Sequence, residues 1–203
     1  YFQSQELLYY INDNYRRAEI NSKIGDVYYV KIDFEKSLEY YLKSLDEFEK
    51  LGENTKLIVD ILFNIGIIHH KKGEYAIAIE FGEKALDMQK SISNEKDKDI
   101  YILGMGIAHV DKGEYAIAIE FLEKALLIQN GFELEYELKL WTTTYLYLAY
   151  KNINKEFDLN EIHTRIKEAD EYIDLDINFR LYQLLDDSSY LETAYSQVKD
   201  EAD

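Results

Sequence analysis

The sequence predicts an all-α protein, a solenoid of antiparallel helix hairpins, and three observations support this fold class. A segment of 15 residues occurs twice: KGEYAIAIEFGEKAL at 72–86 returns as KGEYAIAIEFLEKAL at 112–126, and the single change replaces Gly82 with Leu122. Its apolar residues follow helical spacing. The chain has no proline and is 47% hydrophobic, which suits long helices around a packed interior. Because a repeated helical unit buries its apolar face only against its neighbours, the duplication predicts a stack.

Aligning the duplicated segment with the rest of the chain gives the order of the helices. Gly25 matches Gly66 at an offset of 41 residues, and Lys43-Ser44-Leu45 matches Lys84-Ala85-Leu86 at the same offset. A third copy therefore lies upstream, and the period is about 40 residues. Each copy is expected to contain two helices joined by a very short turn. The first helices end near Lys31, Lys72 and Lys112, and the second helices begin at Asp33, Glu74 and Glu114.

The residues at these turns predict how the helices end and begin. Gly73 and Gly113 supply the left-handed backbone conformation that closes a first helix. Asp33 is expected to be the N-cap of the helix that follows it. Glu74 and Glu114 place negative charge at the positive end of a second helix, where it is favourable.

The remaining segments carry weaker signals. A fourth hairpin is expected from Trp141–Lys151 and Phe157–Tyr172, and two terminal helices from Asp174–Leu185 and Ser188–Val198. Glu6–Ile11 is interpreted as the remnant of a preceding helix. The predicted organisation is a purification-tag remnant at 1–4, an array over 5–172 and C-terminal capping helices over 173–203. The array divides into units of about 15–50, 56–92, 96–130 and 137–172.

Small residues recur at three positions of each copy and would let two helix axes approach closely. They are Gly25, Gly66 and Gly106, then Ser37, Ala78 and Ala118, then Ser44, Ala85 and Ala125. This set, with the aromatic Phe34, Tyr75 and Tyr115, resembles the signature of the tetratricopeptide repeat. The resemblance implies a right-handed superhelix. The long period is similar to that of repeats in cell-polarity adaptors, motor light chains and bacterial peptide-sensing regulators. Gly82 departs from the family pattern, which usually has an aromatic residue there.

Composition excludes several classes of partner and chemistry. The formal net charge of −17 would repel nucleic acids and anionic membranes. The chain has no cysteine, so it can form no disulfide and has no thiol nucleophile, and the compartment is not decided by redox. It has no apolar run long enough to span a bilayer and no signal-peptide pattern, so a cytoplasmic location is expected. His69 and His109 occupy equivalent repeat positions, which favours a packing role over metal binding. No catalytic motif and no cofactor-binding motif is present, and we interpret the protein as a non-enzyme without cofactor or metal.

The tetratricopeptide resemblance implies that partners bind on the inner side of the array, formed by the first helices. The positions carried over as peptide-binding residues are Lys23, Asp26, Asp60, Phe63, Asn64, Ile67, His70, Leu103, Ile107 and Tyr147. Apolar members would anchor an extended or helical peptide, and Asp26 and Asp60 would meet basic residues. The Lys and Arg residues that clamp a peptide carboxylate in some relatives are missing from the third copy.

The function expected from this pattern is a protein-interaction scaffold that binds a partner protein or peptide. An alternative is a regulatory module of a larger signalling protein, such as a cyclase, kinase or transcription regulator. A hydrolase or transferase would require a convergent set of polar side chains, which the sequence lacks. A further alternative is that the terminal helices or a second copy of the chain cover the apolar inner positions, and self-association fits any of these functions.

Overall fold

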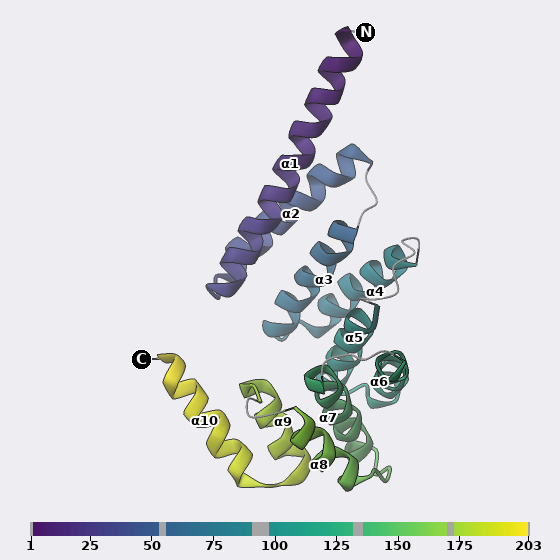
Figure 1. Ribbon diagram of the computed structural model, residues 1–203, viewed down its shortest axis with the longest axis vertical. Coiled ribbons are helices and arrows are strands. Elements are labelled where there is room, and N and C mark those ends of the chain that lie inside the picture. The colour runs from purple at the N-terminus through teal and green to yellow at the C-terminus, as the bar shows by residue number, and fades with distance from the viewer. Residues whose placement is uncertain (1, 53–55, 91–97, 132–135, 170–172, 203) are drawn as a thin grey trace. The chain divides into compact units, whose positions relative to one another are not determined.

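The computed structural model describes residues 2–52, 56–90, 98–131, 136–169 and 173–202, and all regular structure in these ranges is α-helical (Figure 1). The helices are α1 (Phe2–Val30), α2 (Phe34–Leu51), α3 (Lys56–Lys71), α4 (Tyr75–Gln89), α5 (Lys98–Lys112), α6 (Tyr115–Asn130), α7 (Tyr136–Asn152), α8 (Leu159–Glu168), α9 (Leu175–Leu185) and α10 (Ser188–Ala202). The chain forms two compact units, residues 1–101 and 102–203, and each is described by itself.

Unit 1 contains the hairpins α1–α2 and α3–α4, and α2 also packs against α3. Its core is formed by side chains from all four helices, and the fully buried members include Tyr41, Phe48, Ile58, Ile61, Ile65 and Ile68. Unit 2 contains the later part of α5, the α6–α10 helices and a core of its own. There α7 is the central element, because it packs against α6, α8 and α9, while α10 packs against α9.

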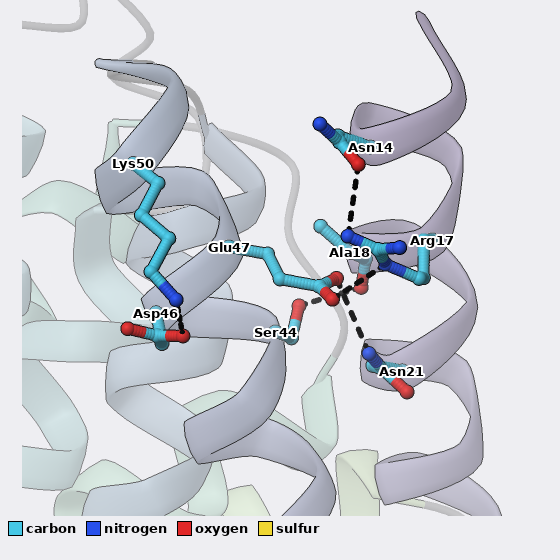
Figure 2. Close-up of polar contacts among 8 residues, drawn as sticks. All are labelled: Asn14, Arg17, Ala18, Asn21, Ser44, Asp46, Glu47 and Lys50. Atoms are coloured by element: carbon cyan, nitrogen blue, oxygen red, sulfur yellow. Dashed lines mark hydrogen bonds and ion pairs between the residues drawn. The ribbon is translucent and has the colours of Figure 1, made fainter. Parts of the chain in front are cut away.

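Polar contacts join α1 to α2 (Figure 2). The buried hydroxyl of Ser44 donates to the carbonyl oxygen of Ala18 at 2.6 Å, and Glu47 accepts from Arg17 at 2.7 Å and from Asn21 at 3.3 Å. Ser37 donates in the same way to the Gly25 carbonyl at 2.8 Å. The first hairpin therefore uses its small residues as hydrogen-bond donors. The other copies have alanine at these positions and cannot form such bonds.

Four residues with positive φ mark the turns between paired helices. They are Ile32 (59°), Gly73 (75°), Gly113 (85°) and Asn154 (57°), and their spacing in the sequence follows the repeat. The left-handed conformation predicted for Gly73 and Gly113 is confirmed. Ile32 is the exception, because a β-branched residue takes a conformation that strongly favours glycine.

The residues predicted at the starts of the helices differ in how they bond. Asp33 is the N-cap of α2, and its side chain accepts from the Lys36 amide, as predicted. The Glu74 and Glu114 carboxylates make no cap hydrogen bond. Residues 6–11 belong to α1, which begins at Phe2, so they do not form a separate preceding helix.

The fourth hairpin starts and ends differently from the prediction. Its first helix is longer than expected, and its second helix begins at Leu159, with Asp158 as N-cap. The predicted end of that second helix at Tyr172 lies outside the described residues. The two terminal helices occur where expected, with Asp174 as the N-cap of α9.

Candidate functional site

A hydrogen-bond network in unit 1 joins side chains of α1, α2 and α3. The Tyr41 hydroxyl donates to Asp26 Oδ1 at 2.5 Å, and Asn64 Nδ2 donates to the Tyr41 oxygen at 3.3 Å. Burial and the bond to Asp26 raise the pKa of the Tyr41 hydroxyl, so it stays protonated and keeps donating near neutral pH. Tyr41 thereby holds an exposed carboxylate and a half-buried amide beside each other.

A second tyrosine makes a similar link about one turn earlier in α3. The Tyr101 hydroxyl, at the start of α5, donates to Asp60 Oδ1. Phe63 packs edge-on against the Tyr101 ring, with the ring centroids 4.9 Å apart and an interplanar angle of 73°. Within the described residues, no lysine or arginine pairs with Asp26 or Asp60.

The other predicted residues of unit 1 add a mixed surface. Lys23 is exposed, and Ile67 and His70 are half-buried, with His70 packed at a tilt on Tyr75. Asp26, Asn64 and Tyr41 are brought together by direct bonds, and Asp60 and Phe63 meet on Tyr101. Sequence reasoning missed both tyrosines, because Tyr41 lies on a second helix and its hydroxyl reaches the first helices past Gly25.

The predicted residues of unit 2 are less accessible. Leu103 is 4% exposed and Tyr147 is 5% exposed, while Ile107 is half-buried. Tyr147 packs on Phe157, and its hydroxyl donates to Glu161 of α8. The placement of Tyr147 on the inner side was wrong. Asn154 follows Gly113 by 41 residues rather than 40, so Tyr147 is equivalent to Gly106 and faces its own hairpin.

Sequence reasoning also missed an ionic cluster of unit 2, formed by Asp111, Tyr145 and Arg180. The Arg180 guanidinium, from α9, pairs with Asp111 Oδ1 at 2.8 Å, donates to the Tyr145 hydroxyl at 3.1 Å and lies 5.2 Å from that ring's centroid. Asp111 comes from α5 and Tyr145 from α7. No repeat pattern could have found this cluster, because Arg180 lies in the helix predicted only as a cap.

His69 and His109 make the same two contacts, one with an aromatic ring and one with a carboxylate. His69 stacks on Phe81 and its Nδ1 lies 2.5 Å from Glu74 Oε2, while His109 stacks on Phe121 with Nδ1 2.7 Å from Glu114 Oε2. Each histidine thus ties the turn carboxylate to the second helix of its hairpin. Among the described residues, no group of three or more potential ligands is placed to hold a metal ion.

None of the described helices combines the length and the hydropathy needed to cross a bilayer.

Profile comparison identifies the family. Two tetratricopeptide repeat profiles match residues 16–91 and 101–131, together more than half of the chain. The chain belongs to the tetratricopeptide repeat family. Both profiles describe repeats and neither describes a catalytic domain. A search of curated proteins gave no match.

Solved structures confirm the predicted fold class of tetratricopeptide-like helix hairpins. BtubC (BKLC) from P. vanneervenii is 18% identical over 75% of this chain and 61% of its own, with a TM-score of 0.66. A Rap protein complexed with competence and sporulation factor is 18% identical over 98% of this chain and 57% of its own, with a TM-score of 0.74. A signal transduction ATPase with a tetratricopeptide repeat sensor, from Pyrococcus horikoshii, is 22% identical over 93% of this chain and 27% of its own, with a TM-score of 0.65. This chain therefore spans less than two thirds of each.

Proposed function

We propose that unit 1 binds a protein segment carrying basic and apolar side chains, and that the protein acts as a non-catalytic interaction scaffold. The proposed binding face consists of Lys23, Asp26, Asp60, Phe63, Asn64, Ile67 and His70. The single observation that carries the proposal is the Tyr41 network, which fixes the Asp26 carboxylate beside the Asn64 amide. A carboxylate held in one position loses less entropy on binding a cation than a free one does.

Unit 2 supports the basic character proposed for the partner. Arg180 pairs there with Asp111 while lying over the Tyr145 ring, so this chain already uses an aspartate and a tyrosine to hold a guanidinium. Asp26 and Asp60 each have a tyrosine partner but no cation among the described residues. A partner arginine or lysine would supply the missing charge, and the half-buried Phe63 and Ile67 offer apolar contact beside it.

The comparisons support binding in general terms. Tetratricopeptide repeats generally bind proteins or peptides, and the similar Rap structure contains the competence and sporulation factor. At 18% identity this likeness concerns the fold, so the ligand of that Rap protein is not transferred to this chain.

A peptide-display selection with the complete chain tests the proposal. We expect enrichment of peptides that combine arginine or lysine with aliphatic residues. Asp26→Asn should weaken the binding of a selected peptide by about tenfold or more, because a charge-assisted contact is worth about 1.5–3 kcal/mol. Ile67→Asp should also abolish capture without unfolding the chain.

Asp46→Asn is the matched control. Asp46 is an exposed aspartate of α2 that pairs only with its neighbour Lys50 among the described residues, so its loss should leave affinity unchanged. Selected peptides without basic residues, or full binding by both the Asp26 and the Ile67 variants, would contradict the proposed binding face.

A second candidate is a regulatory module of a larger signalling protein. The observation in its favour is length: this chain matches only 57% of the Rap protein and 27% of the ATPase whose repeats form a sensor. In those proteins, helices of this kind are a part of a longer chain. The complete open reading frame tests this candidate, because an encoded cyclase, kinase or transcription-regulator domain would support it and the absence of any effector domain would exclude it.

A further inference from the structure

The side of α1 directed away from α2 carries a regular stripe of exposed residues. Arg16, Ile20, Lys23, Val27 and Val30 follow one another at intervals of four and three residues, and we call them the α1 stripe. The three apolar members are between 52% and 78% exposed. Ala18, Ser22 and Gly25, which are buried, lie largely on the other side of the helix. The spacing is that of a seam against which another helix can pack.

Helix α10 carries a comparable stripe in unit 2. Ala194 is buried, whereas Leu191, Tyr195 and Val198 are between 38% and 74% exposed and again follow intervals of four and three. We call these three residues, with the exposed Glu192, the α10 stripe. The α10 stripe offers an aromatic and two aliphatic side chains to a partner.

The charges of the two stripes are complementary. Arg16 and Lys23 make the α1 stripe basic in a chain with a net charge of −17, and neither pairs with a carboxylate among the described residues. The α10 stripe carries one acidic side chain, that of Glu192. Asp187, which lies outside the stripe, stands just before α10, and its bonds to Ser189 lower the pKa of its carboxyl. Lys199 is the one basic residue of α10.

Like charges disfavour the two symmetric alternatives. Two α1 stripes in contact would bring Arg16 and Lys23 of both copies together, and two α10 stripes would bring Glu192 of both copies together. The α1 stripe, from Arg16 to Val30, spans about 21 Å of helix, and the α10 stripe, from Leu191 to Val198, spans about 10 Å, so the α10 stripe would cover about half of the α1 stripe. We propose that the α1 stripe of one copy binds the α10 stripe of a second copy of this chain.

The proposal requires two different faces, and a mixing experiment isolates this feature. Sedimentation analysis of the complete chain should show association that increases with concentration and weakens with salt. Val27→Glu disables only the α1 stripe, and Tyr195→Lys disables only the α10 stripe. Each variant alone should be monomeric. An equimolar mixture should form dimers, because Tyr195→Lys still offers an intact α1 stripe and Val27→Glu an intact α10 stripe.

The controls separate this proposal from its alternatives. Leu127→Glu places the same charge on a 75% exposed leucine of α6 and should associate like the unmodified chain. Circular dichroism checks that each variant keeps its helices. Self-association of Val27→Glu alone or of Tyr195→Lys alone would indicate a symmetric contact and overturn the proposal. A chain that stays monomeric at every concentration would overturn it as well.

Discussion

The hairpins α3–α4 and α5–α6 share a segment of 15 residues with one difference, and that difference lies near the recurring glycine of the first helix. A Cβ added to Gly106 would lie 2.6 Å from Leu122 Cγ, so this glycine makes room for a side chain. A Cβ added to Gly66 would lie 3.1 Å from the Ala78 carbonyl oxygen and 3.7 Å from the Gly82 nitrogen. Gly66 therefore makes room for the backbone of α4. Identical repeat positions therefore do not imply identical packing.

The first hairpin uses a third arrangement at the same position. Tyr41 is equivalent to Gly82 and Leu122, and a Cβ on Gly25 would lie 2.8 Å from its ring. The ring packs over the glycine, and the hydroxyl then reaches Asp26 and Asn64. One position thus decides whether a hairpin fills its interior with an aliphatic group, with backbone or with a tyrosine. In unit 1 the tyrosine organises the proposed binding face.

The largest expected effect comes from removing the side chain that distinguishes the third hairpin. Leu122 is fully buried, so Leu122→Ala should lower the free energy of unfolding of unit 2 by about 3 kcal/mol through lost burial and a new cavity. Trp141, the single tryptophan of the chain, lies in unit 2, and its fluorescence in urea reports this unfolding. Leu127→Ala, at an exposed site of the same helix, should change stability by less than about 0.5 kcal/mol. Equal losses at both sites would contradict the assigned packing.

Overpacking at Gly106 should have the next largest effect. Gly106→Ala forces a methyl group against Leu122 and should cost about 2 kcal/mol. The higher helix propensity of alanine offsets about 1 kcal/mol of this cost, so the free energy of unfolding should fall by about 1 kcal/mol. In the double variant with Leu122→Ala the clash disappears, and the two substitutions should couple favourably by about 2 kcal/mol in urea unfolding. Strict additivity would show that Leu122 is not what the glycine accommodates.

The sequence predicted features that depend on local chemistry. The helices, the left-handed Gly73 and Gly113 and the Asp33 cap follow from residue type and spacing, and all are present. Partners from elsewhere in the fold were not predicted. The Glu74 and Glu114 carboxylates contact His69 and His109, which lie five residues earlier in the chain.

The candidate site was predicted only in part for the same reason. Asp26, Asn64, Asp60 and Phe63 were chosen from their repeat positions, but the tyrosines that hold them come from other helices. Tyr147 was misplaced because its turn residue is Asn154, which carries no glycine signal, and the register shifted by one residue. Arg180 required contacts between three helices, which no single-helix pattern contains.

The turns of the first two hairpins provide a smaller and reciprocal test. Ile32 and Gly73 are equivalent, and both have positive φ, which costs a β-branched residue about 1–2 kcal/mol. Gly73→Ile should destabilise unit 1 by about 1 kcal/mol. Ile32→Gly should stabilise it by about 0.5 kcal/mol, because glycine's greater freedom in the unfolded chain offsets part of the relief. Circular dichroism in urea measures both. Destabilisation by Ile32→Gly would mean that the 74% exposed isoleucine makes a contact that outweighs its backbone strain.

The smallest expected difference concerns the charges beside those turns in the duplicated segment. Lys72 bonds to Glu35 at 2.8 Å and lies 3.7 Å from Glu74, whereas Lys112 bonds to Glu114 at 2.7 Å. The pKa of the Glu114 carboxyl is lowered mainly by Lys112 and then by His109, and the pKa of Glu74 mainly by His69. Lys112→Ala should therefore raise the pKa of Glu114 more than Lys72→Ala raises that of Glu74, as measured by carboxyl NMR titration.

The direction of the linked pH effect follows from these lowered pKa values. A carboxyl group that releases its proton more readily in the folded state stabilises the fold above its ordinary pKa, and this contribution is lost as the pH falls through the lowered value. Acidification should thus weaken both turns, and Glu114→Gln should reduce the acid sensitivity of unit 2. Equal responses of Glu74 and Glu114 to loss of their lysines would mean that Glu35 does not draw Lys72 away, and that the two copies behave alike despite their different neighbours.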